Sequence, residues 1–244
     1  MKVVVNPKYE SLRHFVVSLP ALFDTEGDII YNARNQIKVF TLPDGTRINV
    51  KRYRKPIFIN RLVYSFLREP KAVRAYHYAL RLLKLEVPTP EPIAYILEQK
   101  CGLLAYSFLI TEQSPLRRMF YEFGTGTLVG RENIVKSFAR FTADLHQKGV
   151  YHKDYSPGNI LFEVTNGVPE FTLVDINRME FGTVNMEKGC RNFARLWGKQ
   201  DFFEMIAAEY ATARNFDVAQ CTALILKYRH NFWKQHNRNL FDYE

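Results

Sequence analysis

Short runs of β-branched and aromatic residues, separated by turn residues, dominate the first half of the chain, and this pattern is typical of β-strands. The runs lie at residues 29–31, 36–42, 47–53, 93–97 and 103–110. Between the second and third runs, residues 43–46 read Pro-Asp-Gly-Thr, which are the residue types that form tight turns. The first three runs therefore predict a β-meander, and the last two predict two further strands.

Two stretches have the spacing of three and four residues that marks one face of an amphipathic helix. The first covers residues 71–85 and ends at the proline-rich stretch 87–92, and the second covers residues 132–148 and ends before Gly149. The apolar positions are Ala72, Tyr76, Ala79 and Leu83 in the first stretch and Ile134, Phe138, Phe141 and Leu145 in the second. Each stretch is predicted to form a helix with one buried face.

The second half of the chain contains one further pair of strands. Residues 160–164 and 171–174 favour β-structure and flank Asn166-Gly167, a dipeptide typical of tight hairpin turns. The rest of the chain, to residue 244, reads as mainly helical. Because strands gather in one half and helices in the other, the pattern predicts an α+β protein with two lobes and a cleft between them.

The change of character falls at residues 111–115, which we expect to form a hinge between the lobes. Residues 1–110 are predicted to form an N-terminal lobe, an antiparallel β-sheet with one main helix. Residues 116–244 are predicted to form a mainly helical C-terminal lobe.

The chain is basic, with 34 Lys and Arg against 25 Asp and Glu and a net charge of +9. Such a charge favours an anionic partner, which leaves nucleotides, phosphorylated glycolipids, nucleic acids and anionic membrane faces as candidates. The three cysteines lie far apart in sequence, which argues against a disulfide framework and indicates a reducing, cytoplasmic compartment. We expect neither a signal peptide nor a membrane-spanning segment, and peripheral contact with the inner membrane stays open.

A loop between the second helix and the hairpin carries polar residues suited to phosphoryl transfer. It contains Asp154 and Asn159, and Asp175 follows the second strand of the hairpin. Because that strand returns to the start of the hairpin, we expect the three side chains to meet. Two carboxylates and a carboxamide can hold Mg²⁺ through oxygen ligands and orient an attacking hydroxyl. The alternative is that these residues only cap the loop and form turns, as Asp and Asn often do.

The pattern His152-Lys153-Asp154 with Asn159 five residues later, followed by Asp175, resembles the catalytic loop of the protein-kinase-like fold. Within that fold the chain resembles the bacterial lipopolysaccharide kinases, the Kdo and core-heptose kinase family. The resemblance rests on residues 26–35, 44–53, 87–93 and 151–162, and it extends over residues 23–195. It implies a bilobal protein-kinase-like fold and an ATP-dependent and Mg²⁺-dependent kinase.

The resemblance assigns the chemistry of the C-terminal lobe to four residues. Asp154 would accept or orient the proton of the acceptor hydroxyl, and His152 would support the loop as a scaffold residue. Asn159 and Asp175 would hold Mg²⁺.

The resemblance places nucleotide binding in the N-terminal lobe. Alternation along residues 47–51 turns Lys51 away from the apolar side chains of its strand, and Lys51 would bind the α- and β-phosphates. Arg34 and Asn35, in the turn over the phosphates, would contact the nucleotide where protein kinases use a glycine-rich loop. The backbone around Glu112 would meet adenine as the hinge.

Two features depart from the protein kinases. The turn at residues 31–35 has no glycine, and residues 70–85, which cover the first predicted helix, contain no acid to pair with Lys51. Glu69 or His77 would have to take the place of that acid. A pseudokinase that serves as a binding module therefore stays open as an alternative.

Other departures concern the acceptor. Ser156 stands where protein Ser/Thr kinases carry a lysine, Ile176-Asn177 stands in place of Phe-Gly, and no Ala-Pro-Glu segment follows. The resemblance therefore implies transfer of the γ-phosphate to a sugar hydroxyl of lipopolysaccharide core or a related acidic glycolipid. A kinase for another small molecule or for protein is the alternative within enzymes. A nucleic-acid partner, suggested by charge alone, ranks last, and the sequence does not indicate the oligomeric state.

Overall fold

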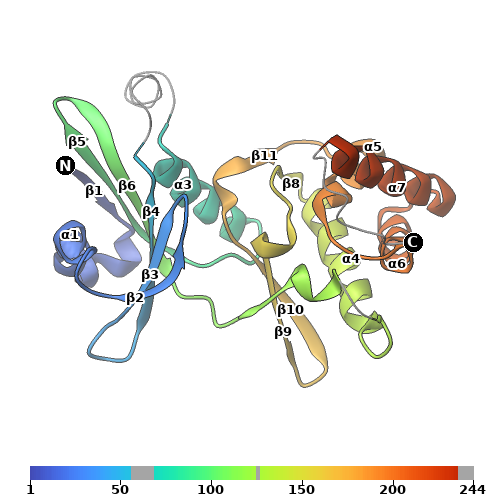
Figure 1. The fold of residues 1–244 in the computed structure, drawn as a ribbon, viewed down its shortest axis with the longest axis horizontal. Helices are drawn as coiled ribbons and strands as arrows, with labels where there is room; N and C mark the ends of the chain where they lie inside the picture. Colours follow the sequence, from blue (N-terminus) through green and yellow to red (C-terminus); the bar gives the residue numbers. More distant parts are fainter. Residues whose placement is uncertain (56–68, 125–126, 236–244) are drawn as a thin grey trace. The chain divides into compact units, whose positions relative to one another are not determined.

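The structure is a computed structural model that describes residues 1–55, 69–124 and 127–235. The chain divides into two compact units, the N-terminal unit Met1–Pro115 and the C-terminal unit Leu116–Glu244. Figure 1 shows the longest strands in the N-terminal unit, coloured blue to green, and most of the helices in the C-terminal unit, coloured yellow to red. The division into a sheet-rich and a mainly helical part confirms the predicted α+β class.

The N-terminal unit is built on a six-stranded antiparallel sheet with the strand order β1-β5-β6-β4-β3-β2. The strands are β1 (Lys2–Val5), β2 (Asp28–Asn32), β3 (Gln36–Thr41), β4 (Arg47–Tyr53), β5 (Pro92–Lys100) and β6 (Leu103–Glu112). All five strands predicted for this part of the chain are present. The sixth, β1, was not predicted, and it extends the sheet by pairing with β5 from Lys2 opposite Leu97 to Val5 opposite Ala94.

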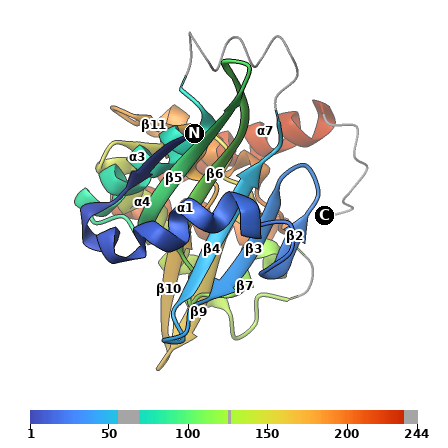
Figure 2. The same cartoon turned by 90° about the vertical axis from the view of Figure 1, so that its left-hand side faces the viewer.

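Helix α1 (Arg13–Leu22), which follows a short 3-10 helix η1 (Pro7–Leu12), covers one face of this sheet. Its buried residues Val16 and Leu19 share a core cluster with Val50 of β4. Figure 2 shows α1 lying across the strands. The prediction of one main helix in this part of the chain is therefore incomplete, because α1 is a second helix that packs on the sheet.

Helix α3 (Lys71–Lys84) covers the other face. Its buried Tyr76 belongs to a cluster with Tyr53 of β4 and Tyr95 of β5. Alternate residues of β4 thus meet different helices, as the two-residue period of a strand requires. Val50 faces α1, whereas Tyr53, on the same side of the strand as Lys51, faces α3.

The C-terminal unit combines four longer helices with short strands. The helices are α4 (Glu132–Gln147), α5 (Met186–Asn192), α6 (Gln200–Arg214) and α7 (Val218–Gln235). The strands form two sheets, one of β7 (Arg118–Met119), β9 (Ile160–Thr165) and β10 (Val168–Leu173), and one of β8 (Val150–His152) and β11 (Met179–Phe181). Helix α4 and the β9–β10 hairpin confirm the predicted elements, and β11 interrupts the stretch predicted to be helical.

Aromatic rings fill the core of the C-terminal unit. Phe138, on the buried face of α4, lies with its ring centroid 4.1 Å from that of Phe120 and 5.8 Å from that of Phe171. Phe162 of β9 contacts Phe120 as well. The helix and the hairpin are therefore joined through one aromatic cluster, which fixes the loop between them. No helix in the described ranges combines the length and the apolar character needed to cross a bilayer.

Candidate active site

The loop between β8 and β9 is held by its own hydrogen bonds. The Asn159 side chain donates from Nδ2 to the carbonyl oxygen of Asp154 at 2.7 Å. Within the loop, the Ser156 N–H donates to the Asp154 carbonyl at 2.8 Å and the Asn159 N–H donates to the Ser156 carbonyl at 2.9 Å. These bonds hold residues 154–159 in a compact turn that ends in the 3-10 helix η3 (Pro157–Asn159).

Asp175 lies next to this loop because the hairpin returns it there. The Val174 N–H donates to the carbonyl of Asn159 at 3.0 Å, one residue before Asp175. Asp175 has a left-handed backbone with φ +52°, a conformation that Asp and Asn adopt more readily than most residues. Its Oδ1 accepts a hydrogen bond from Asn177 Nδ2 at 2.5 Å. The structure thus brings together the three residues that the sequence placed at one site.

His152 hydrogen-bonds both to the loop that carries Asp154 and to the residue before Asp175. Its Nδ1 accepts the Asp154 N–H at 3.0 Å, so Nε2 carries the proton and donates to the carbonyl of Val174 at 3.1 Å. The side chain is fully buried, and this burial lowers the pKa of His152. A neutral imidazole of defined tautomer therefore connects the segment that carries Asp154 to the residue before Asp175.

A second buried network, absent from the sequence predictions, supports His152. Asn192 donates from Nδ2 to the His152 carbonyl at 2.9 Å and accepts from His146 Nε2 at 2.9 Å. His146 Nδ1 then accepts the hydroxyl of Tyr210 at 2.9 Å. Burial lowers the pKa of His146 to about 4. These partners lie on α4, α5 and α6, so no local spacing in the sequence indicates them.

The carboxylate of Asp154 lies between two arginines. Arg195 Nη1 donates to Asp154 Oδ1 at 2.6 Å, and Arg178 Nη1 lies 3.7 Å from Oδ2. The neighbouring Lys153 turns to Glu180 instead. Arg195 and Arg178 were not predicted as site residues. The pairing orients the carboxylate, and the two arginines add positive charge beside it.

Asn159 and Asp175 form a small set of oxygen donors. Because the Asn159 nitrogen is used on the Asp154 carbonyl, its oxygen Oδ1 is the atom left to bind a cation. Within the described ranges, no group of three or more His, Cys, Asp and Glu side chains could hold a metal ion. One amide and one carboxylate nevertheless fit Mg²⁺, which usually keeps several waters and takes further oxygens from substrate phosphates.

The predicted nucleotide residues Lys51, Arg34 and Asn35 lie in the N-terminal unit. Lys51 is central in β4, and its Nζ lies 5.2 Å from the centroid of the Tyr53 ring. Arg34 and Asn35 occupy the turn between β2 and β3, where the backbone N–H of Arg54 donates to Asn35 Oδ1 at 3.2 Å. The turn and the end of β4 line a cavity of about 360 Å³ whose walls include the side chains of Arg34, Asn35, Arg52, Arg54 and Lys55. This cavity suits an anion.

Glu112 is the last residue of β6, and its polar groups are already partly used. Its N–H donates to the Glu91 carbonyl at 2.9 Å, and its Oε1 accepts the hydroxyl of Tyr9 at 2.6 Å. The next residue, Gln113, donates its N–H to the Arg47 carbonyl at 3.0 Å. The Glu112 carbonyl oxygen accepts the hydroxyl of Thr111 at 3.0 Å, so an adenine contact at this carbonyl would have to use its second lone pair.

Comparison with known proteins gives a family match and a structural match. The family model described as "Lipopolysaccharide kinase (Kdo/WaaP) family" matches residues 32–228. Among solved structures, the chain resembles one titled "WaaP in complex with acyl carrier protein", with a TM-score of 0.64 and 16% sequence identity. That match covers 98% of this chain and 100% of the other. The comparison with curated proteins gives no match. The structural likeness confirms the protein-kinase-like fold predicted from the sequence.

Proposed function

The chain belongs to the lipopolysaccharide kinase (Kdo/WaaP) family, and from this premise we propose that it transfers the γ-phosphate of ATP to a sugar hydroxyl of lipopolysaccharide core or a related glycolipid. The family makes the chain a phosphotransferase that acts on a sugar hydroxyl.

One observation carries the proposed mechanism. Asp154, Asn159 and Asp175 lie on two loops that are joined directly, by the bond from Val174 to Asn159, and through His152. In this arrangement Asp154 receives the proton of the acceptor hydroxyl as its oxygen bonds to the γ-phosphorus, while the bond from that phosphorus to the β,γ-bridging oxygen breaks and ADP leaves. Arg195 holds the carboxylate in one orientation, so that the base is in place before the acceptor arrives.

The metal ion is proposed to bind Asn159 through Oδ1 and Asp175 through its carboxylate. When bound, Mg²⁺ neutralises charge on the transferring phosphate. The left-handed backbone of Asp175 and the hydrogen bond from Asn177 orient the carboxylate. The bond from Asn159 Nδ2 to the Asp154 carbonyl links this metal site to the proposed base.

The nucleotide is proposed to meet four residues of the N-terminal unit. Lys51 binds the α- and β-phosphates, and Arg34 and Asn35 contact phosphate from the turn between β2 and β3. Glu112 accepts the adenine amine with its carbonyl. The basic lining of the cavity beside Arg34 supports the assignment of phosphate contacts to this turn.

The acceptor is proposed to be an anionic glycolipid because the chain is strongly basic. A net charge of +9 attracts acidic sugars and phosphates over long range and favours contact with an anionic membrane face. Arg178 and Arg195, which flank the proposed base, add positive charge close to the position proposed for the reacting hydroxyl.

The proposal is tested by phosphate transfer from γ-labelled ATP with Mg²⁺ to purified lipopolysaccharide core acceptors, beside a generic protein acceptor. We expect label in the glycolipid with the native chain and none with Asp154→Ala, while both bind ATP. The matched control is Asp144→Ala, which removes an exposed acid of α4 that pairs with Lys148. Label in the protein but not in the glycolipid would reject the acceptor class, and equal label with Asp154→Ala would reject the proposed base.

A further inference from the structure

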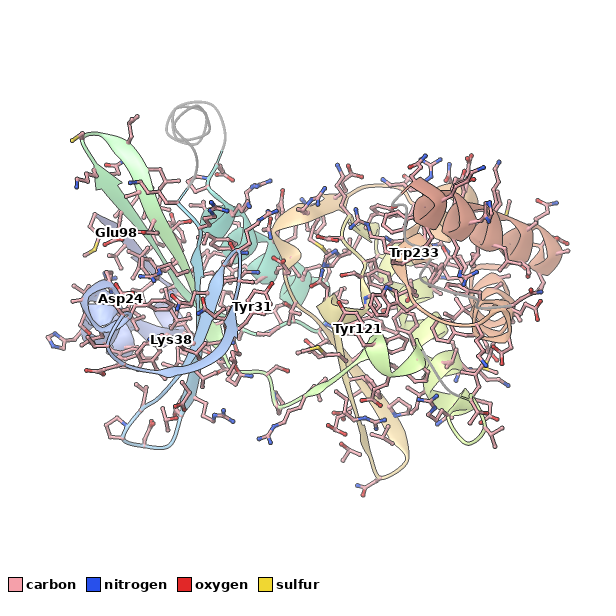
Figure 3. The ribbon with its side chains drawn as sticks, viewed as in Figure 1. Asp24, Tyr31, Lys38, Glu98, Tyr121 and Trp233 are labelled. Carbon is pink, nitrogen blue, oxygen red and sulfur yellow. The ribbon has the colours of Figure 1, made fainter. Side chains whose placement is uncertain are left out.

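Three aromatic side chains form a continuous row in the C-terminal unit. The ring centroids of Tyr121 and Trp197 lie 4.8 Å apart at an interplanar angle of 69°, and those of Trp197 and Trp233 lie 6.2 Å apart at 71°. They come from three segments, the 3-10 helix η2 (Phe120–Phe123), the stretch after Arg195, and α7. Figure 3 labels Tyr121 and Trp233 within this unit. We call these three residues the aromatic row.

The row touches the loop that carries Asp154 and Asn159. A Cβ atom added to Gly158 would lie 2.9 Å from a ring carbon of Tyr121 and 3.0 Å from its hydroxyl. A larger residue at this position would therefore require the Tyr121 ring to shift. Because Gly158 directly precedes Asn159, Tyr121 packs against the loop within one residue of a proposed Mg²⁺ ligand.

Trp197 is linked to the same site through the chain. It lies two residues after Arg195, whose guanidinium binds the carboxylate of Asp154. At about 3.8 Å between successive Cα atoms, its Cα lies within about 8 Å of that of Arg195. The row is therefore close in sequence to the arginine that orients the proposed base.

Burial of the neighbouring residues shows that Tyr121 is not a core residue. Phe120 and Phe123, in the same short helix, are 1% and 2% exposed, whereas Tyr121 is 44% exposed. Trp197 and Trp233 are partly exposed. The row is thus a partly exposed set of aromatic rings that contacts the loop carrying Asp154 and Asn159 through Gly158. Because these rings are partly exposed and contact the loop that carries the proposed base, they are a candidate binding surface.

We propose that the aromatic row is the acceptor subsite, where a pyranose ring of the glycolipid stacks so that its hydroxyl reaches Asp154. The face of an aromatic ring carries negative potential and attracts the partly positive C–H groups on the face of a sugar. Arg195 and Arg178 supply charge for acidic substituents of that sugar. This inference rests on the proposed function and adds the residues that select its acceptor.

Both tryptophans of the chain belong to the row, so intrinsic tryptophan fluorescence reports on this site alone. The first test is a titration of the native chain, without ATP, with delipidated inner-core oligosaccharide of lipopolysaccharide. We expect a saturable change in emission that Tyr121→Leu weakens. Because this measurement needs no phosphoryl transfer, it separates failure of the subsite from failure of the proposed reaction.

The second test measures KM for the glycolipid acceptor and for ATP in Tyr121→Leu and Trp233→Leu. We expect the acceptor KM to rise about five-fold or more in each variant, because each loses one aromatic contact with the sugar. The ATP KM should stay unchanged. Trp233→Phe keeps an aromatic ring, so its acceptor KM should lie close to that of the native chain. This variant also controls for an effect of the leucine substitution on folding. The matched control is Tyr228→Leu, which removes an aromatic residue of α7 outside the row.

Three results would overturn the subsite. These are an oligosaccharide titration without any change in emission, an unchanged acceptor KM in both leucine variants, or a rise confined to the ATP KM, which would mark a nucleotide contact. If the native chain transfers no phosphate but its emission responds to the oligosaccharide and Tyr121→Leu abolishes that response, the proposed reaction fails and the subsite stands.

Discussion

Arg195 holds the carboxylate of Asp154 through a bond of 2.6 Å from Nη1 to Oδ1, across 41 positions of sequence. Arg195 is itself positioned by Phe232 of α7, whose ring centroid lies 5.0 Å from the guanidinium carbon. The orientation of the proposed base thus depends on packing between α7 and the segment that follows α5. A helix far from the catalytic loop in sequence therefore contributes to the site.

Replacing Arg195 should slow transfer without weakening nucleotide binding. In Arg195→Ala the carboxylate of Asp154 is free to rotate, and we expect kcat to fall about 10- to 100-fold. Arg195→Lys should recover only part of the rate, because an ammonium lacks the planar fork of a guanidinium. The matched control is Arg191→Ala, which removes an exposed arginine from α5. Native kcat in Arg195→Ala would show that the ion pair has no part in orienting the base.

The strands and helices that the sequence predicted are those whose signal is local. The period-two runs and the helical spacings of α3 and α4 needed no knowledge of distant partners. The two elements that were not predicted, β1 and α1, lack a clear local signal. Strand β1 is stabilised by pairing with β5, about ninety positions away, and Pro20 inside α1 weakens its local helical signal.

The same distinction applies to the site. The spacing of Asp154, Asn159 and Asp175 is short, and a hairpin between two of them brings all three together, so the sequence predicted that they would meet. Arg195 reaches Asp154, and His146 reaches Tyr210, across 41 and 64 positions, through contacts that only the packed helices create. Their residue types carry no spacing that separates them from ordinary surface or core positions.

The stability of the C-terminal unit should depend on pH through His146. Burial lowers the pKa of this histidine from its ordinary value near 6.5 to about 4. Between these values the unfolded chain binds a proton that the folded chain does not, so the free energy of unfolding falls as the pH falls from 6.5 to 4. The loss is on the order of 3 kcal/mol, and His152, whose pKa is also lowered by burial, adds to it with the same sign.

Urea denaturation at pH 7.5, 6 and 5 measures this effect. We expect His146→Gln to be less stable than the native chain at pH 7.5, because Tyr210 and Asn192 lose a partner, and we expect the difference to shrink as the pH falls. His14→Gln, which replaces an exposed histidine of α1, is the matched control for the loss of a histidine. A difference for His146→Gln that stays constant from pH 7.5 to 5 would show that His146 is not responsible.

Gly189 should be intolerant of any side chain because of Tyr210. A Cβ atom at this position of α5 would lie 2.0 Å from the Tyr210 hydroxyl, so Gly189→Ala must displace the ring and break its bond to His146. We expect a loss of about 2–4 kcal/mol in the free energy of unfolding. Tyr210→Phe removes the hydroxyl that clashes, and the double variant should lose about 1–2 kcal/mol less than the sum of the single losses. Pairing Gly189→Ala with Tyr9→Phe, in the other unit, should be additive, and additivity for both pairs would contradict the clash.

Asp175→Asn should remove metal-dependent nucleotide binding while leaving the fold intact. Asn tolerates the left-handed backbone of this position as well as Asp does, and its oxygen can still accept from Asn177, so we expect no loss of stability. The substitution removes the carboxylate charge that Mg²⁺ requires, so the gain in ATP affinity on adding Mg²⁺ should fall about tenfold or more. Calorimetric titration of ATP with Mg²⁺ and with a chelator measures that gain directly, and Asp144→Asn, an exposed acid of α4, serves as the control of equal charge. If Mg²⁺ increases the ATP affinity of Asp175→Asn as much as that of the native chain, the metal binds to other residues. If Asp175→Asn with Mg²⁺ binds ATP as weakly as the native chain with a chelator, Asp175 holds the metal.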